Sequence, residues 1–460
     1  MGYSDLILFI IYLIVFSVIF KAIRNTYTDP ILKKYHRQAF WVKIIGCIAF
    51  CIYNVYVSPG DSTYLYQTEG NNFYHLILQD PRRLEWVFQK GEMFNEAFLK
   101  DSFNVGYFKS EANFMIIRLV TLFSFITAGR YAAISLIFAC IAFTGLWKLF
   151  LFFYEQYPHL HKKLAIAILF FPSVVFWSSG ILKDSICIAS LGWFTYVVYE
   201  LLYRKKAIIK NLALACLFAY VLAILKIYII ISYTPFFVLF IFLKNMQGIK
   251  NNFLKYLVAP LLIFFCILGF TQTINSFDEE LGAYAVQGLA TSVQKLNDAY
   301  VSMDGDATAE SNFKLGVDFD GTPGGLLKLA PAAIFATFFR PFIWESHKIS
   351  QLMASIESLI LFVFTLFIIF KAGPFRFIKI IFSDPIIMYC FVFSIVFATF
   401  VGASTLNFGT LVRYKIPCLP FYTIALFLIY EKVKARSLAK KLRLAESMSD
   451  NHISSYQIAT

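Results

Sequence analysis

Charge is scarce in this sequence. Only 15% of its 460 residues are charged, whereas 59% are hydrophobic and 19% are aromatic. Soluble domains average about 25% charged residues, so the composition excludes an ordinary soluble fold. Apolar runs long enough to cross a hydrocarbon core of about 30 Å recur along nearly the whole chain. Because helices satisfy their own backbone groups in lipid, the sequence predicts an all-α polytopic membrane protein.

Acidic residues are the scarcer of the charged types, 28 against 41 Lys and Arg, which gives a net charge of +13. In a soluble protein this charge would suggest nucleic acid. Here the basic residues lie beside apolar runs, so we expect no nucleic-acid partner. The basic clusters fall at 21–37, 159–163, 204–210, 244–255, 371–379 and 431–443. Cytoplasmic loops carry such clusters and contact anionic lipids, so we expect them inside, with membrane lipids as partners.

Several other patterns are missing. None of the eight Cys stands at zinc-ligand spacing in a loop, and all lie within or beside apolar runs, so neither disulfides nor a thiolate metal site is expected. No repeat of fixed period suggests an inverted-repeat transporter. The first apolar run, 6–20, lacks a basic start and a small-residue cleavage site, so we interpret it as a mature helix.

Placing every basic cluster inside gives one consistent path of about eleven spans, plus re-entrant or interfacial helices, with the N-terminus outside and the C-terminus inside. The predicted spans are 6–20, 40–56, 131–153, 164–178, 185–203, 212–225, 228–243, 254–269, 352–370, 385–400 and 414–430. Residues 1–433 then form a single transmembrane domain. Residues 434–460 form a basic cytoplasmic tail.

Two long external loops, about 58–112 and 271–327, connect these spans. Apolar residues around Phe73 and Trp86 are spaced as in amphipathic helices on a membrane surface. The second loop holds nine acidic residues against Lys295 and Lys314, the opposite balance to the inner loops. The run 113–127 is short and carries Arg118, so we interpret it as re-entrant or interfacial. The runs 212–225 and 228–243 form a hairpin whose outer turn carries Lys226.

This path places the unusual polar residues at the outer ends of helices. They are Asp61, Glu69, Lys183, Asp184, Lys226, Arg340, Glu345, Asn407 and Arg413, with Glu357 about one turn deeper. A charge in hydrocarbon costs roughly 2.5 to 3.5 kcal/mol, so such residues face a cavity, a partner or the interface. We therefore expect an outer cavity suited to a reaction on a phosphate-linked lipid, with the lipid tail left in the bilayer.

The cations have two interpretations each. Lys183 either belongs to an anion site or marks an outer turn in which Asp184 caps the next helix. Arg340 and Arg413 either grip phosphate through the planar guanidinium or extend to the headgroups. Glu345 either supports such a site or only neutralises Arg340.

Asp61 is the strongest catalytic candidate. A carboxylate just after a membrane helix could act as general base towards an acceptor hydroxyl, or bind a divalent cation such as Mg²⁺ or Mn²⁺. The alternative is that Pro59, Gly60 and Asp61 only form a turn. Glu69 could assist Asp61 or be an ordinary solvated charge.

A Gly-Asp-x-x-Tyr sequence at 60–64 in the first external loop, with many helices and outer basic residues, resembles the membrane-embedded C-type glycosyltransferase superfamily. The resemblance implies that Asp61 is the acidic residue of that loop and that the donor is a polyprenyl-phosphate or polyprenyl-pyrophosphate sugar. The segments FRPFIWE (339–345) and NFGTLVRYK (407–415) are similar to those of O-antigen and exopolysaccharide polymerases, which implies that Arg340 and Arg413 bind the lipid pyrophosphate. A helix precedes the Asp-bearing loop and Ser62 follows Asp61, which leaves metal dependence open.

The expected function is a glycosyltransferase or polysaccharide polymerase of the bacterial inner membrane. Its partners would be a polyprenyl-linked sugar or oligosaccharide and other polysaccharide assembly proteins. Lys183, Lys226, Arg340 and Arg413 would bind the donor phosphate. One alternative is a flippase or transporter of the same lipid, which predicts ionisable groups at mid-depth. Another is a non-catalytic scaffold of an envelope complex, which would dock through the acidic loop.

Overall fold

A computed structural model describes residues 2–89, 110–246, 311–317 and 323–458. These residues form helices, with one isolated β-bridge between Asn312 and Asn407 and no strand. The predicted span 254–269 and nearly all of the predicted loop 271–327 lie outside the described residues. The helical prediction is confirmed for the part of the chain that the structure describes.

Seven of the described helices are long and apolar enough to cross a membrane. They are α1 (Tyr3–Thr26), α2 (Pro30–Ile52, continued by η1 to Val57), α7 (Tyr131–Gln156), α10 (Lys183–Leu202), α11 (Ile208–Met246), α16 (Ile349–Ala372) and α18 (Pro385–Ser404). The short helix α19 (Phe408–Tyr414) and the first part of α20 (Leu419–Ile458) form an eighth candidate with a 63° bend. The chain is therefore a polytopic membrane protein by the length and composition of its helices.

Shorter helices connect and extend this bundle. They are η2 (Asp61–Gln67), α3 (Thr68–Gln79), η3 (Pro81–Phe88), α6 (Glu111–Thr127), η5 (Pro158–Leu160), α8 (His161–Ile168), α9 (Pro172–Trp177), α15 (Pro323–Phe339), η7 (Ile343–Glu345) and α17 (Pro374–Ser383). The segments α3 and η3 confirm the helices predicted around Phe73 and Trp86, whereas their position on the outer membrane surface stays a prediction. Whether α6 crosses the membrane stays a prediction.

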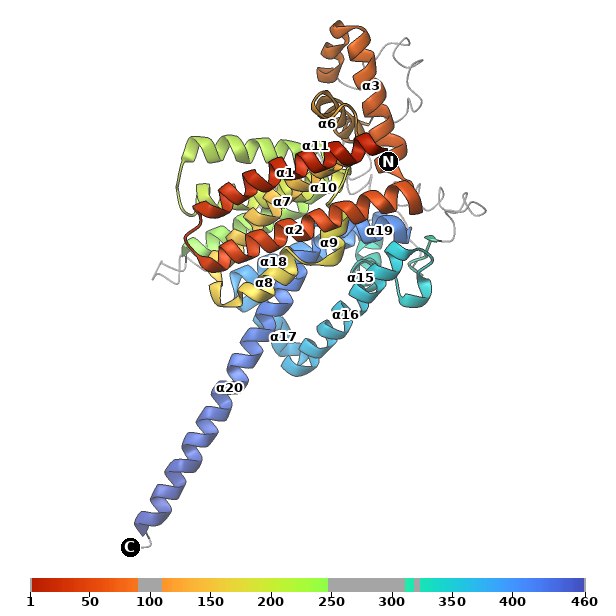
Figure 1. The fold of residues 1–460 in the computed structure, drawn as a ribbon. Coiled ribbons are helices and arrows are strands. Elements are labelled where there is room, and N and C mark those ends of the chain that lie inside the picture. Colours follow the sequence, from red (N-terminus) through yellow and green to blue (C-terminus); the bar gives the residue numbers. More distant parts are fainter. Residues whose placement is uncertain (1, 90–109, 247–310, 318–322, 459–460) are drawn as a thin grey trace.

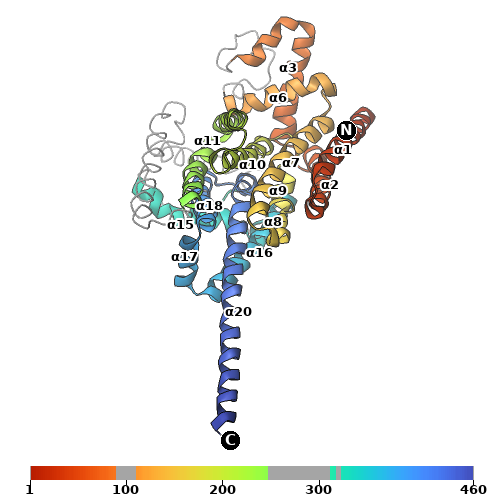
Figure 2. The same ribbon diagram turned by 90° about the vertical axis from the view of Figure 1, so that its left-hand side faces the viewer.

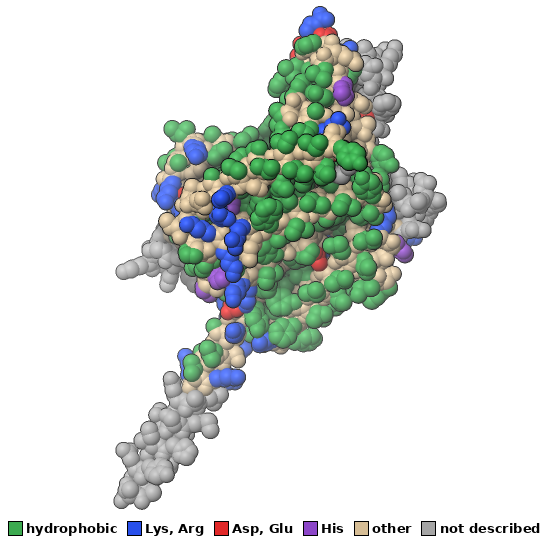
Figure 3. Space-filling view, viewed as in Figure 1, with side chains coloured by type: hydrophobic (Ala, Val, Ile, Leu, Met, Phe, Trp, Pro, Cys, Tyr) green, Lys and Arg blue, Asp and Glu red, His purple; other side chains and the backbone are tan. Residues whose placement is uncertain are grey.

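The two ends of the bundle differ in composition. The N-terminus, α3 and α19 lie at one end, and α20 extends far from the other (Figures 1 and 2). Hydrophobic side chains cover the face between these ends, and Lys and Arg side chains gather in a band near the departure of α20 (Figure 3). We call the two ends the α3 end and the α20 end. This separation agrees with a cytoplasmic α20 end, which stays a prediction.

The helix α7 and its neighbour α10 form the centre of the bundle. In the most apolar stretch of α7, 83% of the residues are buried. Gly145 of α7 and Gly192 of α10 let the two backbones touch: a Cβ at Gly192 would lie 2.0 Å from the Gly145 carbonyl oxygen. Small residues at such a contact are how membrane helices gain close van der Waals packing. In the most apolar stretch of α1, by contrast, only 11% of the residues are buried, so α1 lies at the periphery.

The helix α11 is a hairpin rather than one rod. Its 39 residues would extend about 58 Å, almost twice the hydrocarbon thickness. The helix breaks at Lys226, which has φ −156° and ψ 79°. Lys226 lies beside Asp184 at the start of α10, and Lys244 donates to the Tyr199 hydroxyl near the end of α10. The second half therefore runs parallel to α10 and the first half returns beside it, as the sequence predicts.

The predicted span 164–178 is wrong as a single helix. The chain forms α8 and α9 instead, with a break between Ile168 and Pro172. Proline cannot continue a preceding helix, and it disfavours helical geometry at Phe171 before it. This break, the hairpin in α11 and the undescribed 254–269 account for the difference between the predicted count of about eleven spans and the seven or eight found.

The contact between α7 and α10 predicts a stability effect. Gly192→Ala should lower the free energy of unfolding by about 1 to 3 kcal/mol, because a methyl group would press on backbone that cannot rotate away. Thermal unfolding of the detergent-purified protein measures this. The matched control is Gly60→Ala, where a Cβ meets no atom within 4 Å. Equal transitions for wild type and Gly192→Ala would contradict the contact.

Candidate functional site

The corner between α19 and α20 carries three consecutive side chains that contact different parts of the bundle. Asn407 precedes α19 and its Oδ1 accepts from the Thr410 amide at 3.3 Å, which starts the helix. The helix ends after seven residues, and the chain bends into α20. Arg413, Tyr414 and Lys415 lie at this bend. The bend therefore decides which elements these three residues reach.

Arg413 joins two segments that are far apart in the sequence. Its Nη1 and Nη2 each donate to Asp61 Oδ2 at 3.1 Å, and its Nε lies 3.0 Å from Asp184 Oδ2. The Arg413 side chain is 14% exposed and Asp61 is 46% exposed. Arg413 thus connects the start of η2 with the start of α10.

Lys226 completes the buried side of this group. Its Nζ donates to Asp184 Oδ1 at 2.5 Å and lies 3.8 Å from the centre of the Tyr414 ring. The side chain of Asp184 is 0% exposed and that of Lys226 is 4% exposed. Asp184 is the second residue of α10, whose N-cap is Leu182, so the interpretation of Asp184 as a helix cap is wrong. Asp184 instead holds two cations in place.

Lys183 lies on the accessible side of the same group. Its Nζ donates to Asn113 Oδ1 at 2.9 Å, and the Tyr66 hydroxyl donates to the same oxygen at 3.1 Å. Burial raises the pKa of the Tyr66 phenol well above its usual range, so the hydroxyl keeps its proton as a donor. Lys183 is thus held by a neutral acceptor and forms no ion pair with a carboxylate among the described residues.

We call Asp61, Lys183, Asp184, Lys226 and Arg413 the Arg413 cluster. It contains three cations and two carboxylates, a net charge of +1. The Nε of Arg413 and Oδ2 of Asp184 are buried and close, yet neither has a hydrogen-bond partner among the described residues. Their contact is an ion pair without hydrogen-bond alignment. The structure thus joins five of the predicted site residues in one place and leaves a guanidinium with unused hydrogen-bonding capacity.

Arg340 is held apart from this cluster. It forms a bidentate ion pair with Glu345, with Nε 3.0 Å from Oε1, and its Nη1 donates to the Lys314 carbonyl. Its guanidinium also lies 4.7 and 5.0 Å from the ring centres of Phe313 and Phe408. A phosphate would have to displace Glu345 to reach Arg340. Its role as a phosphate ligand stays a prediction.

Three ionisable side chains form a second polar region, in which Lys43 and Lys415 are buried and Glu357 is half-buried. Glu357 of α16 accepts from the Ser173 amide at 2.7 Å and also bonds the Ser173 hydroxyl. Lys415 donates to Ser358 Oγ at 2.9 Å and to the Arg340 carbonyl at 3.1 Å. Lys43 of α2 donates to Ser178 Oγ at 2.5 Å. Glu357 and Lys43 thus bind residues of α9 or its C-cap, and Lys415 binds α16 from the corner.

Sequence reasoning missed Lys43 and Lys415. Lys43 stands alone within the predicted span 40–56, and an isolated Lys inside an apolar run was the available signal. Lys415 follows Arg413 by two residues and carries no separate signal.

The remaining predicted residues have simpler surroundings. Asn407 starts α19, and its Nδ2 donates to Asn312 Oδ1 at 2.9 Å, which fixes the returning chain of the second loop. Glu69 is buried in α3, so its interpretation as an ordinary solvated charge is wrong. Its assistance to Asp61 stays a prediction.

The cluster fits an anion better than a metal ion. The described residues contain no group of three or more His, Cys, Asp or Glu that could hold a metal. In the described part of the chain Asp61 forms an ion pair with Arg413, and Asp184 forms ion pairs with Lys226 and Arg413. A divalent cation needs several oxygen ligands, which this arrangement does not offer. The predicted Mg²⁺ or Mn²⁺ therefore has no supporting donor set in the described residues.

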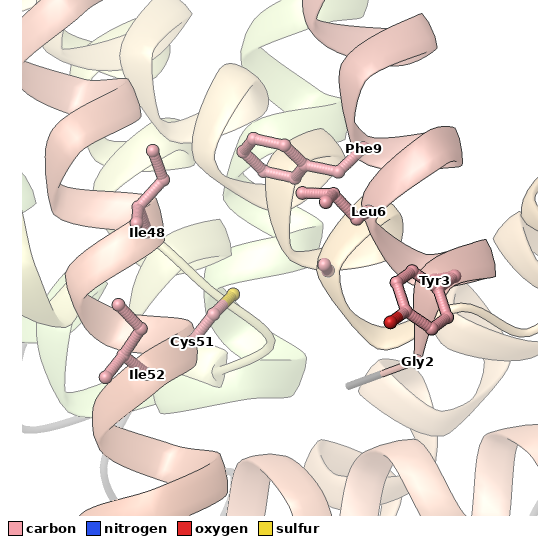
Figure 4. A pocket seen from close by; sticks show the side chains of 8 residues that line it. Gly2, Tyr3, Leu6, Phe9, Ile48, Cys51 and Ile52 are labelled. Carbon is pink, nitrogen blue, oxygen red and sulfur yellow. The ribbon is translucent and has the colours of Figure 1, made fainter.

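An apolar cavity of about 550 Å³ lies between α1, α2 and α7 (Figure 4). Its walls are made by Gly2, Tyr3, Leu6, Phe9, Ile48, Cys51, Ile52 and Ala132. Tyr131, next to Ala132, shares a 2.8 Å hydrogen bond with the hydroxyl of Ser62, which follows Asp61. This hydrogen bond links the segment that carries Asp61 to α7, which also forms one wall of the cavity.

Comparison of the chain with protein families, curated proteins and solved structures finds no match. The functional conclusion therefore rests on the geometry of the site.

The buried ion pair predicts a large stability effect. Asp184→Asn should lower the free energy of unfolding by about 3 to 5 kcal/mol, because Lys226 and Arg413 would keep buried charges without their shared carboxylate. Thermal unfolding of the purified protein measures the loss, and adding Lys226→Met should recover part of it. Asp80→Asn, which affects an exposed pair with Arg82, is the control and should change nothing. An unchanged transition for Asp184→Asn would contradict this account.

Proposed function

We propose that this chain is an inner-membrane glycosyltransferase or polysaccharide polymerase that uses a polyprenyl-phosphate or polyprenyl-pyrophosphate sugar as donor. The observation that carries the proposal is the contact of Arg413 with both Asp61 and Asp184. It puts a half-exposed carboxylate and three cations into one group at the α3 end. Such a group can bind a phosphate and accept a proton within the same site.

Binding of the donor follows from the two sides of the cluster. Asp184 is buried, forms an ion pair with the buried Lys226 and holds the Arg413 guanidinium from behind. Lys183 and the Asp61-facing nitrogens of Arg413 are the positions that a phosphate could reach. Arg413 would offer a planar fork and Lys183 a point charge. The apolar cavity between α1, α2 and α7 would hold part of the lipid tail.

The reaction would use Asp61 as general base. When the donor phosphate takes the Arg413 nitrogens, Asp61 loses its partner and is free to accept a proton. The acceptor hydroxyl oxygen then bonds to the anomeric carbon as its proton passes to Asp61. The bond between that carbon and the phosphate oxygen breaks, and the phosphate leaves with the electron pair, stabilised by Arg413 and Lys183. Other polysaccharide assembly proteins would supply the acceptor or remove the product.

The role of Asp61 predicts a selective loss of activity. Asp61→Asn should reduce glycosyl transfer by about 100-fold or more, because an amide cannot accept the hydroxyl proton. The measurement is the formation of glycosidic bonds by protein in proteoliposomes that contain a polyprenyl-pyrophosphate oligosaccharide. The matched control is Asp80→Asn, the same change on the same external segment, with unchanged transfer expected. Full activity of Asp61→Asn in folded protein would refute the assignment.

A second candidate, a flippase of the same lipid, is favoured by one observation. Ionisable groups lie within or beside the spans: Lys43 and Lys415 are buried and Glu357 is half-buried. Glu357 also binds the chain at the break between α8 and α9. Broken helices beside polar groups line the substrate path in many transporters. A non-catalytic scaffold would show neither bond formation nor leaflet transfer in the same vesicles.

Glu357→Gln separates the two active classes. In the proposed enzyme this change should leave bond formation close to wild type, because Glu357 contacts Ser173 and not the Arg413 cluster among the described residues. In a flippase it should stop the movement of a labelled lipid-linked oligosaccharide between leaflets, and Asp61→Asn should not. An assay of both readouts on both variants decides: loss of leaflet transfer confined to Glu357→Gln would replace the enzyme with the flippase.

A further inference from the structure

The short helix α17 connects α16 and α18 at the α20 end. Gly373, with φ 78°, makes the turn after α16, a conformation that L side chains rarely adopt. Pro374 then starts α17, and Asp384 ends it and caps α18 by accepting from the Ile386 amide at 3.1 Å. The charge of Asp384 is already taken by Lys432 of α20 at 2.8 Å. The position of α17 is therefore fixed at both ends.

The side chains of α17 divide into three faces. Phe377 and Ile381 are buried against the bundle. Phe375, Ile378 and Phe382 are 90%, 53% and 65% exposed, at the spacing i, i+3, i+7 of one helix face. Arg376 and Lys379 are exposed beside them. The helix α17 therefore has one face that packs on the protein, one exposed apolar face and one exposed basic face. Each face requires a different environment.

The open apolar face continues the lipid-facing surface of the spans. Phe370, near the end of α16, is 80% exposed, and Phe367 one turn earlier is 47% exposed. Exposed aromatic residues here join the hydrophobic side chains of the membrane-crossing face, so hydrocarbon is the medium that covers them. Lys371 lies 4.9 Å from the centre of the Tyr430 ring, in the last turn of α16. It marks the position along α16 at which a charged side chain follows the apolar ones.

The basic face has no acidic partner within the described residues. Neither Arg376 nor Lys379 forms an ion pair there, whereas the nearby carboxylates Asp384 and Glu431 are bound by Lys432 and Lys163. The band of Lys and Arg side chains at this end of the bundle adds to the same positive field (Figure 3). Two unpaired cations beside an apolar face match the boundary between acyl chains and anionic headgroups.

We propose that α17 is a binding surface for anionic phospholipid in the leaflet at the α20 end. Phe375, Ile378 and Phe382 contact the upper acyl chains, and Arg376 and Lys379 bind the phosphate groups. The helix lies along the membrane surface and fixes the depth at which α16 and α18 cross. This surface does not depend on the proposed function, because it lies at the opposite end from the Arg413 cluster.

The test uses the full-length protein in phosphatidylcholine vesicles with increasing phosphatidylglycerol. Wild type should show a thermal transition that rises with phosphatidylglycerol and falls back when salt is added. The double variant Arg376→Gln/Lys379→Gln should lose most of this rise. In native mass spectrometry it should bind phosphatidylglycerol more weakly, by about fivefold for each charge removed. Arg376→Lys/Lys379→Arg, which keeps both charges, should behave as wild type.

The matched control is Lys440→Gln/Lys441→Gln, which removes the same charge from α20 beyond the bundle. It should keep the dependence on phosphatidylglycerol. Equal losses in both double variants would show a general effect of charge and overturn the proposal, as would a wild type that does not distinguish the two lipids. A second variant, Phe375→Ser/Phe382→Ser, tests the apolar face: it should weaken phosphatidylglycerol and phosphatidylcholine binding together, and unchanged binding would also overturn the proposal.

Discussion

The ion pairs of Arg413 are the contacts on which the candidate site depends. They join Asp61, at the start of η2, to Asp184, at the start of α10. The buried pair of Asp184 and Lys226 fixes the guanidinium from one side, and Asp61 meets it from the accessible side. A buried charge pair costs desolvation, so its presence in an apolar bundle is easier to explain by function than by stability.

Much of the arrangement follows from the distribution of charge in the sequence. Keeping basic clusters on one side placed Asp61, Lys183, Asp184, Lys226 and Arg413 at a common end, and the structure brings these five together. Lys226 was predictable as the turn of a hairpin because a charge interrupts an apolar run of twice the span length. In each case the free-energy cost of placing a charged side chain in lipid identifies the residue as unusual from the sequence alone.

Other features could not be found this way, since they depend on tertiary partners. The break before Pro172 is visible as a proline, but only Glu357 of a distant helix satisfies the amide that the break exposes. For Arg340 the sequence left two interpretations open, and the ion pair with Glu345 in the structure is the one in which Glu345 neutralises it. Lys415 lies two residues from Arg413 and faces a separate polar region, because the corner of the chain turns the two side chains to different neighbours.

The backbone contact between Gly145 and Gly192 has a consequence for motion at the site. Two helices that touch through main-chain atoms cannot slide without losing that fit, so α10 presents Lys183 and Asp184 on a rigid wall. Asp61 is the first residue of η2, a helix with widened turns, and Arg413 lies at a bend, so these two are the adjustable parts. Closure around a ligand would therefore be a hinge movement of the corner against a fixed half-site.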